Sequence, residues 1–183
     1  EGEFSAIFYL KDKYDLEDSG TFWLSETPDK VSFGWDAACR RVCTWAVLVN
    51  KETGIKYAHL NSHFDHVGIS ARKNSVDLIV NKAKEFGDIP VVFTADMNVK
   101  EGSDNYKQFV DSGVLKDTKY LAPDTMNYCT YHDTKPEKHK DDVIDYVMIN
   151  DNFEAVSYKV VTEGIDGRFV SDHYPVYADI IVK

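Results

Sequence analysis

The chain has 183 residues, 43% of them hydrophobic and 28% charged, which is ordinary for a single soluble globular domain with a sizeable core. The formal net charge of −10, from 31 acidic and 21 basic residues, argues against broad, sequence-independent binding to nucleic acid. No apolar run approaches the roughly 20 residues that a membrane span requires, and no signal peptide is visible, so a cytoplasmic and an exported protein both fit the sequence.

Apolar patterning divides the chain into strands and helices. In chain order, strands are predicted at residues 4–10, 21–24, 42–50, 55–62, 89–96, 141–150, 153–161 and 174–182. Helical spacing predicts a long helix at 68–86 and a shorter one at 104–111. The polar stretch 122–142 predicts a mobile surface loop. Because hairpins and helical crossovers both join the strands, we expect an α/β fold with mixed sheets.

Four polar clusters lie at or near the ends of predicted strands. Asn-Ser-His-Phe-Asp-His follows one strand at 61–66, and Ala-Asp-Met-Asn follows another at 95–98. Asp145 lies early in a third strand, and Ser-Asp-His precedes the last strand at 171–173. The exit of one strand can neighbour the entrance of an antiparallel one, so all four clusters can meet at one rim of a mixed sheet.

Asp145 is the hardest of these polar residues to explain as part of a turn. It is flanked by Val143, Ile144 and Val147, and a carboxylate in such surroundings is costly without a cation or a hydrogen-bond donor nearby. His173 is a suitable donor, and an Asp–His pair would fix the tautomer of the imidazole. The other clusters, taken singly, are equally explained by the preference of Asp and Asn for turns.

The cysteines and tryptophans give weaker signals. The three cysteines cannot all pair with one another, and the spacing of Cys39 and Cys43 matches no common zinc motif, so we expect small apolar packing residues. Trp45 lies within a predicted strand and is expected in the core. Trp35, next to Gly34, is a candidate for the wall of a pocket.

The motifs NSHFDH, ADMN, IDYV and SDHYPV occur in this order, and together they resemble the endonuclease/exonuclease/phosphatase superfamily. This superfamily includes exonuclease III-like repair nucleases and pancreatic-type deoxyribonuclease, and FWLSETPDK with GWDAACRRVCTWA resembles one of its bacterial branches. The resemblance implies a four-layer α/β sandwich, in which two mixed β-sheets lie face to face with helices outside. It also implies the hydrolysis of a phosphoester with Mg²⁺, or with Mn²⁺ in its place.

The resemblance further implies a set of catalytic residues. His173 corresponds to the histidine of the family's His/Asp pair, held by Asp145, and acts either as a base toward water or as a stabiliser of charge on the phosphorane. Asp96 and Asn98 correspond to the residues that orient the attacking water and contact the phosphate. His63 corresponds to the histidine that contacts the phosphate or assists the leaving oxygen. Phosphoryl transfer builds negative charge on oxygen atoms, which such groups and a hard cation can stabilise.

A phosphate-binding arginine follows from the same resemblance. Arg41 is expected to contact the phosphate together with Asn98 and His63, and Arg40 is the alternative arginine. A small set of protein ligands is enough for the metal, because Mg²⁺ keeps several of its waters.

The metal site departs from the family pattern. Asp172 corresponds to a metal-ligand carboxylate and Asp96 is expected at the same ion, but family members also carry a Gln-Glu pair that supplies the main metal carboxylate. Gln108 is the only glutamine here, and Glu26 lies after the position of the family's glutamate. We therefore expect residues 1–183 to be the C-terminal two-thirds of one domain, completed by a missing N-terminal segment or a second chain. Alone, they are expected to bind Mg²⁺ weakly and to hydrolyse poorly.

The leading functional interpretation is a metal-dependent phosphoester hydrolase of the phosphodiesterase or nuclease type, acting on nucleic acid or a small phosphodiester. The alternative enzyme is a phosphomonoesterase, or a lipid or sugar phosphodiesterase with a small substrate, which the acidic net charge slightly favours. A non-catalytic binding module that retains the fold is a third interpretation, favoured by the absent Gln-Glu pair. Kinship at the level of the fold does not identify the substrate.

Overall fold

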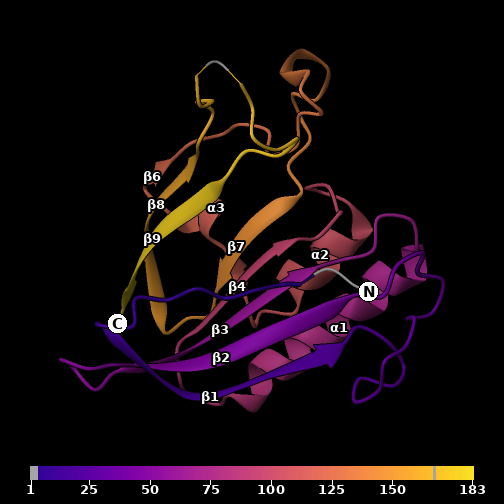
Figure 1. Ribbon diagram of the computed structural model, residues 1–183. Coiled ribbons are helices and arrows are strands. Elements are labelled where there is room, and N and C mark those ends of the chain that lie inside the picture. Colours follow the sequence, from indigo (N-terminus) through magenta and orange to yellow (C-terminus); the bar gives the residue numbers. More distant parts are fainter. Residues whose placement is uncertain (1–3, 167) are drawn as a thin grey trace.

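Two β-sheets with helices against them build the structure, a computed structural model that describes residues 4–166 and 168–183 (Figure 1). The larger sheet has the strand order β1 (Tyr14–Trp23), β2 (Val42–Asn50), β3 (Lys56–His63), β4 (Val91–Asp96), β7 (Asp145–Ile149) and β5 (Lys116–Asp117). The smaller sheet has the order β6 (Asp124–Thr125), β8 (Phe153–Val160) and β9 (Val176–Val182). The helices are α1 (Ile69–Glu85), α2 (Asp104–Asp111), α3 (Thr118–Leu121) and the 3₁₀ turn η1 (Pro136–Lys138).

Both sheets contain parallel and antiparallel pairs. In the larger sheet β3 and β4 are parallel, whereas β2 and β7 run antiparallel to these neighbours. In the smaller sheet β6 is parallel to β8, and β9 is antiparallel to β8. The predicted α/β class with two mixed sheets is confirmed, and the arrangement is an α/β sandwich.

Alternating side chains of the larger sheet build two separate cores. In β4, Phe93 faces the helices and stacks on Phe109 of α2 with ring centroids 5.4 Å apart. The preceding residue, Val92, belongs to a second core with Phe153 and Tyr158 of the smaller sheet. Successive strand residues point to opposite faces, so β4 is covered by helices on one side and by the smaller sheet on the other.

The central connections agree with the sequence analysis. β2 and β3, predicted as strands at 42–50 and 55–62, form a hairpin, in which Asn50 Oδ1 accepts hydrogen bonds from the backbone N–H groups of Glu52 and Thr53, and Gly54 has a φ of 70°. The predicted long helix is α1, and it supplies the crossover that a parallel β3–β4 pair needs. Among the described residues, no helix is both long and apolar enough to cross a bilayer.

The prediction of a strand at residues 4–10 is wrong. This segment has no regular structure and runs across the larger sheet (Figure 1), where the Asn61 side-chain amide donates a hydrogen bond to the carbonyl of Ala6 at 3.0 Å. The first strand is instead β1, of which only the end at 21–24 was predicted. As an edge strand with Asp15, Glu17 and Asp18 exposed, β1 lacks the apolar alternation that identifies a half-buried strand.

The predicted loop at 122–142 is attached to the sheets at several points. It contains the short strand β6 and the turn η1, and the backbone N–H of Tyr174 donates to the carbonyl of Thr130 at 2.7 Å. Tyr131 also pairs with His173 in an isolated β-bridge. Elements as short as α3, β5 and β6 contain too few residues to show a period in the sequence.

Candidate active site

A cleft of about 840 Å³ opens where β3, β4 and β7 meet the loops that follow or precede them. Its lining includes seven residues that the sequence analysis assigned to catalysis, phosphate binding or metal binding, namely Arg41, His63, Asp96, Asn98, Asp145, Asp172 and His173. These residues come from positions up to 132 apart in the sequence, 173 minus 41, and each of the four polar clusters contributes at least one. The structure therefore gathers them in one place, whereas their individual roles stay predictions.

Strand register sets a row of three polar side chains along this rim. In the parallel β3–β4 pair, His63 lies opposite Asp96. In the antiparallel β4–β7 pair, Asp96 lies opposite Asp145. Paired residues of neighbouring strands place their side chains on the same face, so an imidazole and two carboxylates stand side by side across three strands.

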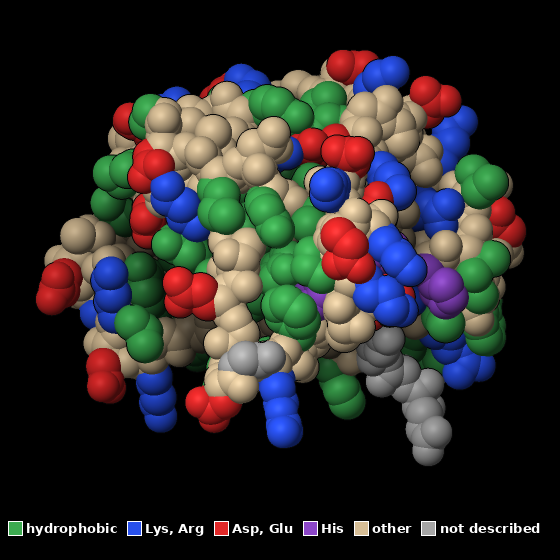
Figure 2. All heavy atoms as spheres, turned by 90° about the horizontal axis from the view of Figure 1, so that it is seen from above, with side chains coloured by type: hydrophobic (Ala, Val, Ile, Leu, Met, Phe, Trp, Pro, Cys, Tyr) green, Lys and Arg blue, Asp and Glu red, His purple; other side chains and the backbone are tan. Residues whose placement is uncertain are grey.

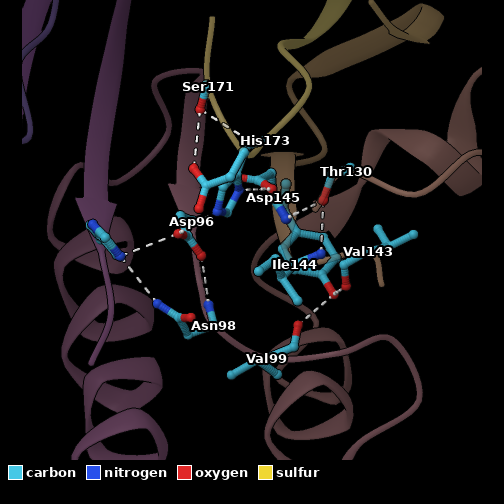
Figure 3. Close-up of polar contacts among 12 residues, drawn as sticks. Asp96, Asn98, Val99, Thr130, Val143, Ile144, Asp145, Ser171 and His173 are labelled. Carbon is cyan, nitrogen blue, oxygen red and sulfur yellow. Dashed lines mark hydrogen bonds and ion pairs between the residues drawn. The ribbon is translucent and has the colours of Figure 1, made fainter. Parts of the chain in front are cut away.

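Asp145 and His173 form a hydrogen-bonded pair (Figure 3). The Nδ1 atom of His173 lies 2.8 Å from Asp145 Oδ2, and this bond is the main cause that raises the pKa of His173 above its ordinary value. The backbone around Asp145 is fixed by Thr130, whose Oγ1 accepts hydrogen bonds from the N–H groups of Ile144 at 3.0 Å and Asp145 at 3.1 Å. The start of β7 is thus held to the segment that contains Thr130, and the carboxylate of Asp145 is left to meet the His173 ring.

Asp96 lies between two imidazoles. Its Oδ2 atom is 3.2 Å from His63 Nε2 and 3.8 Å from His173 Nε2. Burial, followed by the like charge of Asp145, raises the pKa of Asp96, although both histidines act in the opposite direction. Two nearby carboxylates that are partly buried repel each other, and a cation or a bound proton relieves that repulsion.

Asn98 turns the chain back toward the row of polar side chains. Its φ of 49° is the left-handed conformation that Asn tolerates better than most residues, and its N–H donates to Asp96 Oδ1 at 2.9 Å. Its Nδ2 atom donates to the carbonyl of Phe64 at 3.1 Å and lies 3.1 Å from His63 Nε2. The amide is therefore held from both sides of the β3–β4 edge.

The two candidate arginines occupy different environments. Arg41 is buried, with 6% of its surface exposed, and lines the cleft, where its Nη2 atom lies 3.5 Å from His66 Nδ1. Arg40 is exposed, and its guanidinium lies over the ring of Phe33 at 4.9 Å. The geometry favours Arg41 for contact with a phosphate in the cleft.

Several cleft residues carry no signal in the sequence. Lys100 forms an ion pair with Asp142, which also bonds to His139 at 2.7 Å. The ring of Tyr131 lies edge-on to that of His173, with centroids 5.1 Å apart. Tyr131, His139 and Asp142 belong to the stretch predicted as a polar loop, and Lys100 lies just beyond the ADMN motif. Tertiary structure brings Lys100, Tyr131 and Asp142 to the cleft.

The weaker predictions have mixed outcomes. Trp45, expected in the core, is half-buried at its margin and packs there with Phe86, with ring centroids 5.7 Å apart. Cys43 and Cys129 are buried free thiols, as predicted for packing residues, whereas Cys39 is half-buried and lines the cleft. Trp35 is not among the residues that line the cleft in the described part of the chain.

The donor atoms of the site fit a divalent cation. Asp96, Asp145 and His173 each place one ligand atom within 4.8 Å of the other two. Carboxylate oxygens are the ligands that Mg²⁺ and Mn²⁺ prefer. Asp172 lines the same cleft but stands outside this group of three, and Glu26 instead accepts a hydrogen bond from the N–H of Trp35 at 3.1 Å.

Solved structures share this fold over almost the whole chain. An endonuclease/exonuclease/phosphatase from Bacteroides vulgatus is 39% identical, with a TM-score of 0.89, over 96% of this chain and 69% of its own. A mannosyl-6-phosphatase from Bacteroides thetaiotaomicron is 34% identical, with a TM-score of 0.89, over 94% of this chain and 69% of its own. A conserved protein of unknown function from Enterococcus faecalis is 28% identical, with a TM-score of 0.85, over 96% of this chain and 69% of its own.

The fold is that of a class of proteins that includes enzymes acting on phosphoester bonds. At 39% and 34% identity to solved members, this chain belongs to the endonuclease/exonuclease/phosphatase family. The resemblance noted in the sequence is thereby confirmed. A scan of family models and a search of curated proteins find no match for the chain.

The hydrogen bond that His173 donates to Asp145 should control the titration of His173. Asp145→Asn keeps the shape of the side chain but removes its charge, so the pKa of His173 should fall toward the ordinary histidine value. Because the folded-state pKa is raised, the stability that this pair contributes is present at low pH and lost as the pH rises through that pKa. NMR titration of the histidine rings in metal-free protein measures the change.

Asp142→Asn is the matched control, since Asp142 bonds to His139 and not to His173. It should leave the pKa of His173 close to that of the parent protein. An unchanged His173 titration in Asp145→Asn would show that the pair does not control this ring.

Proposed function

We propose that the protein hydrolyses a phosphoester by activating a water molecule in the cleft for attack on phosphorus. The observation that carries this proposal is the row of His63, Asp96 and Asp145 across three strands, with His173 against its end. An imidazole paired to a carboxylate can move a proton, and a second carboxylate beside it can orient water.

His173 is the proposed proton acceptor. Its Nδ1 atom bonds to Asp145, and its Nε2 atom lies 3.8 Å from Asp96 Oδ2. A water held between Nε2 and the Asp96 carboxylate would lose a proton to Nε2 as its oxygen bonds to phosphorus. The hydrogen bond that Nδ1 donates to Asp145 favours the protonated ring, which then stabilises charge on the phosphoryl oxygens.

Three residues are proposed to hold the phosphate and the leaving oxygen. The Asn98 amide and the His63 Nε2 atom are 3.1 Å apart, so both can reach one phosphoryl oxygen. Arg41 contributes a permanent positive charge on the same cleft. His63 would protonate the leaving oxygen when the phosphorus–oxygen bond breaks, which spares that oxygen a full negative charge.

A divalent cation, Mg²⁺ or Mn²⁺, is the proposed cofactor. Asp96 and Asp145 supply neighbouring carboxylate oxygens and Asp172 is a further carboxylate on the cleft, which leaves His173 Nε2 for the proton. When bound, such an ion would offset the charge of the phosphate and stabilise the charge that develops during its transfer. The partial burial of two neighbouring carboxylates supports the need for a cation here.

A further segment of the same protein is proposed to complete the domain. This agrees with the expectation that residues 1–183 form the C-terminal two-thirds of one domain. The match covers 69% of each of the three solved relatives, so about a third of the length of each lies outside it. A groove of about 640 Å³ lies between the two sheets, lined by apolar side chains that include Tyr57, Val147 and Ile180. A structure of a longer chain would test this: its extra residues should fill the groove, and a groove left open would count against the proposal.

A phosphorylated sugar or another small phosphomonoester is the favoured substrate class among the alternatives. The relative at 34% identity is a mannosyl-6-phosphatase, and the net charge of this chain is −10. On the face seen in Figure 2, acidic and basic side chains are interspersed and leave no continuous basic surface among the described residues. Nucleic-acid binding relies on such surfaces, so these observations favour a small substrate over a long polyanion.

Replacing His173 should remove most of the activity. In assays of p-nitrophenyl phosphate, bis-p-nitrophenyl phosphate and a hexose 6-phosphate with Mg²⁺ or Mn²⁺, His173→Ala should lower kcat/KM by roughly 100- to 10,000-fold. The two monoesters should be better substrates than the diester.

His139→Ala is the control, because His139 bonds to Asp142 and lies outside the proposed machinery. Its activity should stay close to that of the parent protein. Equal turnover by His173→Ala and the parent would favour a binding module that has lost catalysis. A preference of the parent protein for the diester would instead favour the nuclease-type interpretation.

A further inference from the structure

A second group of metal-ligating side chains lies on the cleft wall beside Arg41. Cys39, Asp65 and His66 each place one ligand atom within 4.8 Å of the other two. Cys39 belongs to the loop before β2, whereas Asp65 and His66 follow β3. None of the three has a part in the proposed hydrolysis, and their spacing in the sequence gives no metal motif, because two separate segments supply them.

Asp65 is a fixed and ionised member of this group. It is 2% exposed, and burial alone would raise its pKa, but hydrogen bonds from the backbone N–H groups of Gly68, Cys39 and Val67 outweigh burial and lower the pKa to about 2. The bond from Cys39 N, at 2.9 Å to Oδ2, holds the cysteine backbone against the carboxylate. A carboxylate oxygen has two lone pairs, so Oδ2 retains the capacity to bind a cation.

Cys39 and His66 are free to adjust, since Cys39 is half-buried and His66 is exposed. Zinc–sulfur bonds of about 2.3 Å and zinc–nitrogen or zinc–oxygen bonds of about 2.0–2.2 Å hold the ligand atoms closer together than 4.8 Å, and side chains that are not buried can make this adjustment. The charge of Arg41, whose Nη2 atom lies 3.5 Å from His66 Nδ1, opposes a cation. The two anionic ligands, thiolate and carboxylate, offset the charge of the ion itself.

We propose that Cys39, Asp65 and His66 bind a zinc ion at a site separate from the one that contains Asp96. A thiolate and an imidazole select zinc over magnesium, whereas the carboxylate-rich group around Asp96 has the opposite preference. The Cys39 thiol releases its proton to solvent on binding, and the fourth position of the ion is open to the cleft. The ion links the loop before β2 to the turn after β3, and both segments lie beside Arg41. The site goes beyond the proposed hydrolysis and does not depend on it.

Cobalt reports on this site directly, because Co²⁺ bound to a thiolate gives a near-ultraviolet charge-transfer absorption. Titrating Co²⁺ into the metal-free protein should produce this band with one equivalent bound, and Zn²⁺ should displace it. Cys39→Ser should abolish the band. His66→Ala should weaken Co²⁺ binding by roughly 10- to 100-fold, the range seen when a metal site loses one of its supporting groups.

Cys129→Ser is the control, because Cys129 is a buried free thiol outside the cleft lining. It should keep the band unchanged, and Zn²⁺ should raise the Tm of the parent and of Cys129→Ser by more than that of Cys39→Ser, in which the group around Asp96 is still present. A missing band at stoichiometric Co²⁺, or a band that survives in Cys39→Ser, would overturn the proposal. Mg²⁺-dependent hydrolysis by Cys39→Ser is measured in parallel, so a failure of the zinc site and a failure of the hydrolase proposal are told apart.

Discussion

The register of β3, β4 and β7 is the constraint on which the site depends. Parallel pairing places His63 beside Asp96, and antiparallel pairing places Asp96 beside Asp145. A slip of one residue in either pair would turn one of these side chains to the other face of the sheet. The two carboxylates are then neighbours by backbone geometry, and their repulsion is offset by the two imidazoles beside them and by any cation or proton that they bind.

Backbone hydrogen bonds, more than side-chain packing, hold the polar groups in place. Thr130 fixes the start of β7, the bridge between Tyr131 and His173 brings the last histidine to the rim, and Asn98 is tied to Asp96 through its own N–H. Groups held in this way need little reorganisation during a reaction, which is the property that makes electrostatic stabilisation effective. The same principle extends to Asp65, which three backbone N–H groups hold beside Cys39.

Strand-end motifs made much of the fold and the site predictable from the sequence. The hairpin, α1, β4 and the polar clusters could be read because apolar periods and the residues that interrupt them are local signals. β1 could not, because an exposed edge strand carries no apolar alternation. Tyr131 could not either, since its place in the cleft follows from a bridge to His173, 42 residues away by subtraction of their numbers. The cluster of Cys39 with His66 likewise depends on tertiary packing.

Binding of Mn²⁺, followed by electron paramagnetic resonance of the free ion, tests most directly whether these carboxylates form a metal site. Asp96→Asn and Asp145→Asn should each weaken binding to the parent's strongest site by at least tenfold, since each loses one anionic ligand. Asp111→Asn, at the exposed end of α2, should bind as the parent does. Equal Mn²⁺ affinity in all four proteins would contradict the account, because the ion would then lie elsewhere.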